Sequence, residues 1–122
     1  MASMSESQSS KEVFDVNEAL DRVAGDQDLL KEIAQLLVEG LPNQIMQIQE
    51  GVDTNNAQAV MEAAHALKGS VGNFAARRAY DAAYRLEQMG REGGLTEGQT
   101  ALSDLKEELQ ALQQALKTHG IL

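Results

Sequence analysis

The sequence predicts an all-α fold, an antiparallel four-helix bundle with a short additional N-terminal helix. Only 3% of the 122 residues are aromatic, and the abundant Ala, Leu, Glu and Gln favour helices over strands. Long stretches carry apolar residues at helical spacing, and short polar turns separate them. Helices joined in this way pack side by side in alternating directions. With 43% hydrophobic residues the chain can bury one modest core, which indicates a single domain.

Residues 1–11 (MASMSESQSSK) differ in composition from the rest of the chain. They are rich in Ser and show no apolar periodicity, so burial cannot offset the entropy of ordering them. We expect a disordered tail or linker over 1–11 and the bundle domain over 12–122.

Sequence signals mark both ends of the first short helix. Asp15 and Glu18 form a capping box, and Gly25 is expected to stop the helix. Phe14, directly before the cap, should anchor this helix to the core. Asp26 then caps the second helix.

The second helix is expected to continue through Pro42 with a kink, since the apolar period is the same on both sides. The polar cluster over 53–56 (DTNN) predicts a turn and the cap of a third helix. The predicted buried stripe of the second helix consists of Leu29, Ile33, Leu36, Leu37, Leu41, Ile45 and Ile48.

The later helices follow from the same patterns. A fourth helix is expected over 76–89, followed by a loop over 90–94 (GREGG). A capping box of Thr96 and Gln99 predicts the start of the last helix, which should end near Gly120. The predicted buried faces are Val60, Ala64, Leu67, Val71 and Phe74 in the third helix, Ala79, Ala83 and Leu86 in the fourth, and Leu102, Leu105, Leu109, Leu112 and Leu116 in the last.

The formal net charge of -9 excludes whole classes of partner. A nucleic-acid binder must neutralise several phosphates, which ten scattered Lys and Arg residues cannot do, and anionic membrane surfaces are disfavoured for the same reason. No apolar run approaches the roughly 20 residues that span a bilayer, and no signal-peptide pattern is present. The absence of cysteine excludes disulfides and thiol catalysis. We therefore expect a cytoplasmic segment that binds neither nucleic acid nor membrane.

His65 is the candidate functional residue. At about 100° per residue it points roughly 140° away from the buried face of its helix and should face water. Lys68, Gly69 and Gly72 follow at i+3, i+4 and i+7, on the same side. A glycine inside a helix costs about 0.5–1 kcal/mol relative to alanine, so two of them here indicate clearance for an approaching partner. Met61, one turn earlier, would add apolar contact to that partner.

These residue types suit phosphoryl chemistry. A neutral imidazole is a competent nucleophile near pH 7 and can attack an acyl phosphate, while a lysine offsets charge on the transferred oxygens. The sequence has no glycine-rich phosphate loop, no nucleotide-binding glycine box and no Ser/His/Asp or Cys/His set. We expect a phosphocarrier without ATP-binding or kinase activity of its own.

The run AHALKGSVGNF over 64–74 resembles the signature of histidine-containing phosphotransfer domains, His-x-Leu-Lys-Gly-Ser followed by small residues. Ala75 departs from the family, which frequently has glycine there. The pattern is met at His65, Leu67, Lys68, Gly69 and Ser70, and the likeness extends to Phe14-Asp15, Gly25-Asp26, Leu29-Leu30, Leu86-Glu87 and Gly90-Arg91.

The resemblance implies that His65 is phosphorylated on a four-helix bundle and that Lys68 stabilises charge. Family members often place a polar side chain from the following helix against the imidazole. By spacing, Glu87 is the counterpart here, with Arg91 nearby. The implied docking and clearance surface consists of Met61, Gly69, Ser70 and Gly72.

The resemblance also implies partners. The domain would accept a phosphoryl group from a receiver-domain aspartate and pass it reversibly to another response-regulator aspartate. These receivers would belong to response regulators and to a hybrid histidine kinase, of which this chain could be an excised domain. No metal or cofactor is expected in the chain, since Mg²⁺ would sit in the receiver. A single exposed site needs no dimer, so we expect a monomer.

Two alternatives stay open from the sequence. The chain could be a docking adaptor that binds a receiver without accepting phosphate. Glu62 and His65 also form a Glu-x-x-His pair, but a di-iron bundle needs a second pair and inward-facing ligands, which are missing here. His119 is expected to be an ordinary solvated residue, and Arg77 and Arg78 either meet an acidic partner or face solvent.

Overall fold

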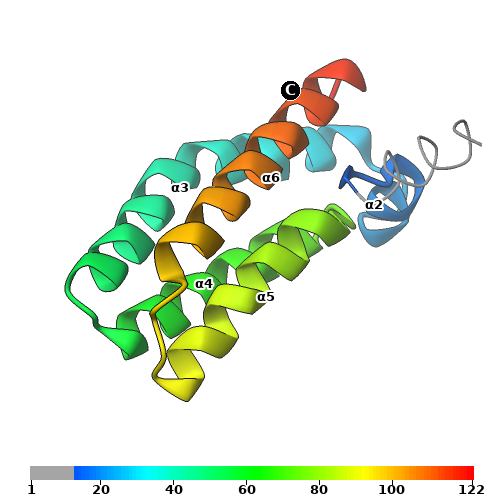
Figure 1. Cartoon of the computed structure of the whole chain (residues 1–122). Coiled ribbons are helices and arrows are strands. Elements are labelled where there is room, and N and C mark those ends of the chain that lie inside the picture. Colours follow the sequence, from blue (N-terminus) through cyan, green and yellow to red (C-terminus); the bar gives the residue numbers. More distant parts are fainter. Residues whose placement is uncertain (1–12) are drawn as a thin grey trace, which may run out of the picture.

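The computed structural model describes residues 13–122 and contains, within this range, helices and no strands (Figure 1). The predicted all-α fold is confirmed. Four long helices joined by short turns lie side by side, and the short α2 lies at one end of the bundle. The predicted tail over 1–11 falls outside the described residues. The helices are α2 (Val16–Arg22), α3 (Gln27–Asp53), α4 (Ala57–Gly72), α5 (Arg77–Glu92) and α6 (Gly98–Thr118).

Three of the predicted helix starts are capped by side chains. An oxygen of Asp15, Asp26 and Asn56 accepts a hydrogen bond from the backbone N–H three residues later, at 3.1, 3.0 and 3.1 Å. Each bond satisfies one backbone donor that the first turn of a helix leaves unpaired. The exposed Pro42 lies inside α3, which continues on both sides of it as a single helix.

The predicted capping box of Thr96 and Gln99 is wrong. The last helix begins at Gly98 without a side-chain capping bond. Gln99 instead accepts, through Oε1, a hydrogen bond from Nε2 of Gln49 on α3 at 2.8 Å. Gly98 is buried, and a Cβ there would lie 3.2 Å from Val52, so close contact with α3 governs the start of α6.

The fourth predicted helix is longer than expected, and the loop predicted over 90–94 is mostly wrong. The helix α5 continues past Gly90 to Glu92 and is capped by Gly93, whose φ of 81° is left-handed. Gly90 is buried against α4: a Cβ there would lie 2.5 Å from the carbonyl oxygen of Ala57 and 2.7 Å from the nitrogen of Met61. This glycine allows two helices to approach closely and does not end its own helix.

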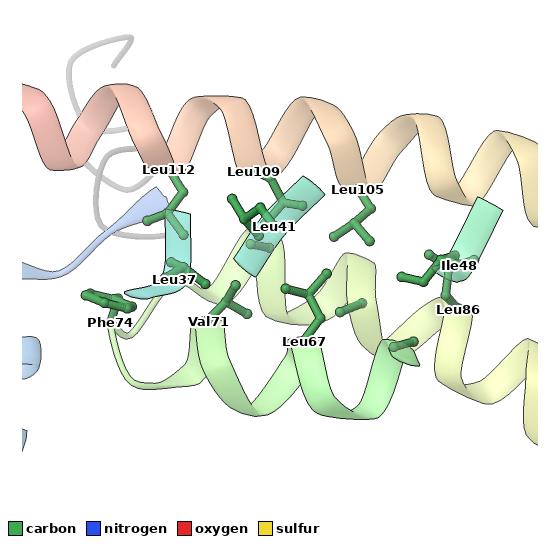
Figure 2. Packing of buried hydrophobic residues seen from close by; sticks show 14 of the residues in the cluster. Leu37, Leu41, Ile48, Leu67, Val71, Phe74, Leu86, Leu105, Leu109 and Leu112 are labelled. Atoms are coloured by element: carbon green, nitrogen blue, oxygen red, sulfur yellow. The ribbon is translucent and has the colours of Figure 1, made fainter. Parts of the chain in front are cut away.

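Apolar side chains from the four long helices meet in the centre of the bundle (Figure 2). Every residue of the faces predicted for the last three helices is buried, so these faces are confirmed. The stripe predicted for α3 is partly wrong, because Leu29 and Leu36 are 40% and 68% exposed while Leu30 and Ala34 are buried. The buried line of α3, which packs against α4 and α6, includes Leu30 and Leu37, whereas their neighbours one residue earlier are exposed.

The buried Phe14 anchors α2 to the bundle, as predicted. Its ring centroid lies 6.5 Å from that of Phe74 and 5.4 Å from that of His119. The imidazole of His119 is exposed, as expected, and it also stands edge-on to the Phe14 ring. Residues from both ends of the described chain therefore meet at the same end of the bundle.

Arg77 and Arg78 form ion pairs within the chain. Nε and Nη2 of Arg78 donate to the carboxylate of Glu108 on α6 at 2.6 and 2.7 Å. Arg77 lies 3.8 Å from a carboxylate oxygen of Glu18 on α2. These pairs join α5 to its neighbours at the end of the bundle that α2 covers.

Candidate functional site

The packing of α4 places His65 on the outside of the bundle. Ala64 and Leu67, on either side of it in sequence, are fully buried against the other helices, so the side chain between them points outward. The imidazole is 68% exposed. The expectation that His65 faces water is confirmed.

Glu87 of α5 lies beneath the imidazole and contacts three charged or titratable side chains. Its Oε2 lies 3.2 Å from Nδ1 of His65 and 2.8 Å from Nη2 of Arg91, and its Oε1 lies 2.8 Å from Nζ of Lys68. The Glu87 side chain is only 2% exposed. The close approach of α4 and α5 at Gly90, one turn further along, brings this carboxylate to the histidine.

The contact between Glu87 and Lys68 shifts the pKa of each side chain in the direction that favours its charged form. The ion pair with Lys68 is the largest influence on the pKa of Glu87 and lowers it below its ordinary value of 4.5; burial opposes this, and the contact with His65 adds to it. The same pair raises the pKa of Lys68 above 10.5. At neutral pH the site therefore holds a buried carboxylate and a lysine ammonium in contact.

This carboxylate determines the tautomer of the neutral imidazole. An ionised carboxylate can only accept hydrogen bonds, so the short contact assigns the proton to Nδ1 of His65, which donates to Glu87. Nε2 then keeps its lone pair. In its neutral form the imidazole thus presents the lone pair of Nε2 on a largely exposed side chain.

A shallow pocket of about 400 Å³ adjoins the imidazole. It is lined by Met61 and Glu62 of α4, by His65 itself, and by Glu87 and Arg91 of α5. Its wall is thus both apolar and charged, and the pocket brings Met61 and Arg91 next to the histidine as the sequence predicts.

The remaining predicted residues differ in what surrounds them. A Cβ at the exposed Gly69 would meet nothing within 4 Å, so the helix surface there is open. A Cβ at Gly72 would lie 3.6 Å from the ring of Tyr80, which already occupies the space beside it. Ser70 donates its hydroxyl to the carbonyl of Ala66 and lines a different pocket, between α3 and α4. The structure therefore does not bring Ser70 to the site.

Two tyrosines at the site were not predicted. Nζ of Lys68 lies 5.7 Å from the ring centroid of Tyr80 and 5.1 Å from that of Tyr84. The two residues stand four apart, on the same face of α5 as Glu87. This spacing was the available signal, but only the register of α5 against α4 shows that it faces Lys68.

Residues 13–122 contain no group of three or more His, Cys, Asp or Glu side chains that could hold a metal ion. Glu62, the partner of His65 in the Glu-x-x-His pair, accepts a hydrogen bond from Gln58 at 3.1 Å. In the same range, no helix has the length and apolar character needed to cross a membrane.

Comparisons with known proteins indicate a family and a fold. The sequence profile of a family described as "Hpt domain" matches residues 32–115, from within α3 to within α6, a range that includes His65 and Glu87. Among solved structures, the chain is similar to the HPT domain from a sensor hybrid histidine kinase of Shewanella, with a TM-score of 0.71 and 18% identity over 88% of this chain and 97% of that chain. At this identity the structural likeness concerns the fold. A search of curated proteins found no match.

Proposed function

Because the chain belongs to the Hpt domain family, which serves histidine phosphotransfer in phosphorelays, we propose that His65 carries the phosphoryl group. The observation that carries this proposal is the 3.2 Å contact between Nδ1 of His65 and the buried carboxylate of Glu87. In the neutral imidazole this contact places the proton on Nδ1 and leaves the lone pair on Nε2, where a partner's phosphoryl group can reach it in line.

The transfer needs no further reactant. Nε2 of His65 attacks the phosphorus of an aspartyl phosphate on a receiver domain; the P–N bond forms, the P–O bond breaks, and its electrons leave with the aspartate carboxylate. Nδ1 keeps its proton, so the phosphorylated ring is positively charged and faces the carboxylate of Glu87, which stabilises it. Since acyl phosphates and phosphoramidates are both energy-rich, the group can pass on to another response-regulator aspartate or return.

Lys68 and Arg91 are the cations of the proposed site. Each lies 2.8 Å from one oxygen of the carboxylate that contacts the imidazole. In our proposal Lys68 offsets charge on the transferred oxygens, and Arg91 is a second, more exposed cation near the phosphate. The open surface at Gly69 admits the partner, and the Mg²⁺ that assists transfer belongs to the receiver domain.

The partners that we propose are receiver domains of response regulators and of a hybrid histidine kinase. The family supports a receiver as partner, and the Shewanella domain of similar fold comes from a sensor hybrid histidine kinase. We propose a monomeric phosphocarrier that works in the cytoplasm, without nucleic acid, membrane contact or kinase activity of its own.

The test is transfer of radiolabel from a phosphorylated receiver domain to this chain. We expect acid-labile, base-stable label on the wild type and none on His65→Gln, which should still bind the receiver. His119→Gln, which changes the other histidine of the chain, is the matched control and should keep the label. Label on His65→Gln would overturn the assignment of the site. Binding without label on the wild type, for several receivers, would favour a docking adaptor.

A further inference from the structure

Lys68 does not extend freely into solvent as most surface lysines do. Its side chain is 16% exposed and its Nζ lies 2.8 Å from Oε1 of Glu87. The same ammonium lies over the rings of Tyr80 and Tyr84, at 5.7 and 5.1 Å from their centroids. A cation within about 6 Å of an aromatic centroid is attracted by the ring quadrupole. One carboxylate and two rings therefore hold the ammonium.

The rings are themselves held in place by α4 and α5. Tyr80 lies beside Gly72, where a Cβ would be in ordinary van der Waals contact with the ring at 3.6 and 3.7 Å. The hydroxyl of Tyr84 accepts a hydrogen bond from Nε2 of Gln88 at 2.5 Å. Gly72 and Lys68 are one turn apart on α4, so the helix turn that contacts the Tyr80 ring also bears Lys68.

We propose that Tyr80 and Tyr84 are positioning residues that hold the ammonium of Lys68 beside His65 before the phosphoryl group arrives. This inference rests on the proposed phosphotransfer at His65. A free lysine must give up much of its rotamer freedom to engage a phosphoryl group, whereas a lysine that is already held gives up less. The Lys68 side chain is only 16% exposed, and a less solvated ammonium has a stronger field at the transferred oxygens.

The tyrosines are about 40% exposed, so they could also contact a docked receiver directly. The two roles differ in what they change. A docking contact changes the affinity for the receiver. A residue that positions Lys68 changes the rate of transfer within the complex, and only while Lys68 is present.

The experiment measures single-turnover transfer at saturating phosphorylated receiver, together with receiver affinity. We expect Tyr80→Leu and Tyr84→Leu to slow transfer about three- to tenfold, the size of a lost cation–π contact, with affinity nearly unchanged. Tyr84→Phe keeps the ring near Lys68 and loses the bond to Gln88, so it should recover most of the rate that Tyr84→Leu loses. In a Lys68→Gln background, the Leu substitutions should cause no further loss.

Three results would overturn the inference: Leu variants as fast as the wild type, an equal loss when Lys68 is already Gln, or a change in receiver affinity alone. Circular dichroism would verify that the Leu variants are folded. Failure of the proposed function looks different, because the wild type would then take up no label. Label on wild-type His65 with unchanged Leu variants rejects only the role of the tyrosines.

Discussion

At the scale of single residues, Glu87 is the side chain that links the other charged and titratable residues of the site. It is buried, and its two oxygens contact His65, Lys68 and Arg91. A carboxylate in such a place stays ionised only if it is paired, and Lys68 foremost lowers its pKa below 4.5. Because this pKa is lower in the folded than in the unfolded chain, the ionised form stabilises the fold at pH values above 4.5. That contribution is lost as the pH falls toward the folded-state pKa.

Replacing Glu87 by Gln tests this pairing. We expect the free energy of unfolding at pH 7 to fall by about 1–3 kcal/mol, because Lys68 loses its buried carboxylate partner. The difference from the wild type should shrink as the pH falls below 4.5, because Glu87 of the unfolded chain then takes up a proton before Glu87 of the folded chain, whose pKa is lower. Urea unfolding of both proteins from about pH 7 to pH 3 measures it. Glu62→Gln, an exposed control on α4, should change little, and a pH-independent Glu87→Gln difference would contradict the argument.

Two alanines adopt left-handed backbone conformations and form a matched pair. Ala24 has a φ of 54° and is exposed, while Ala75 has a φ of 53° and is buried. Since glycine accepts this conformation without strain, Ala24→Gly should raise the free energy of unfolding by about 0.5–1 kcal/mol. Ala75→Gly relieves the same strain but also loses a buried methyl worth about 0.8 kcal/mol, so it should be nearly neutral. Denaturant unfolding measures the stability change of each variant. Equal changes in the two variants would contradict the argument that the buried methyl of Ala75 contributes to stability.

The sequence predicted His65, Lys68, Glu87 and Arg91, which the structure joins through the carboxylate of Glu87, while their roles stay predictions. Lys68 follows from helical spacing to His65, which needs no tertiary information. Glu87 and Arg91 follow from the family resemblance. The contact of Tyr80 and Tyr84 with Lys68 could not be predicted, because it depends on the register of two helices, and helical periodicity alone does not fix that register.

At the scale of helices, prediction succeeded where one face is buried and failed where packing overrides local signals. The leucines of α6 recur so regularly that the buried face follows directly from the period. In α3, apolar residues cover more than one face, and only contact with α4 and α6 decides that Leu30 is buried and Leu29 is not. Gly90 resembles a helix end in sequence but serves a close helix–helix contact.

Glycine-to-alanine substitutions distinguish this close contact from open surface. In Gly90→Ala the new methyl would lie 2.5 Å from the carbonyl oxygen of Ala57, so the helices must separate and stability should fall by about 2–4 kcal/mol. In Gly69→Ala the methyl meets nothing, and the better helix former should add about 0.5–1 kcal/mol. Thermal or urea unfolding measures both.

The same Gly69→Ala variant tests the clearance prediction. If the open surface admits the receiver, the stabilised variant should bind the receiver more weakly and take up label more slowly than the wild type. Unchanged binding and labelling would mean that the glycine is not needed for docking.

At the scale of the whole molecule, the N-terminal helix lies outside the helices that build the site. The family profile begins at residue 32 and covers only the four long helices, so α2 lies outside it. The site is built from α4 and α5, which pack closely along their length. By contrast, α2 lies at one end of the bundle, where the ring of Phe14 contacts Phe74 and His119 and the buried Ala19 joins the core.

Phe14→Ala should therefore loosen α2 without disabling the site. We expect the free energy of unfolding to fall by about 2–4 kcal/mol, because a buried ring leaves a cavity that the end of the bundle cannot fully close. Amide hydrogen exchange should accelerate in α2 far more than in α4, and His65 should still take up label within about twofold of the wild-type rate. Leu105→Ala, in the centre of the core, is the matched control: a similar loss of stability should accelerate exchange in all four long helices. If the folded Phe14→Ala protein took up no label, α2 would have to belong to the receiver-docking surface, because its loosening would have removed contacts that the site itself does not supply.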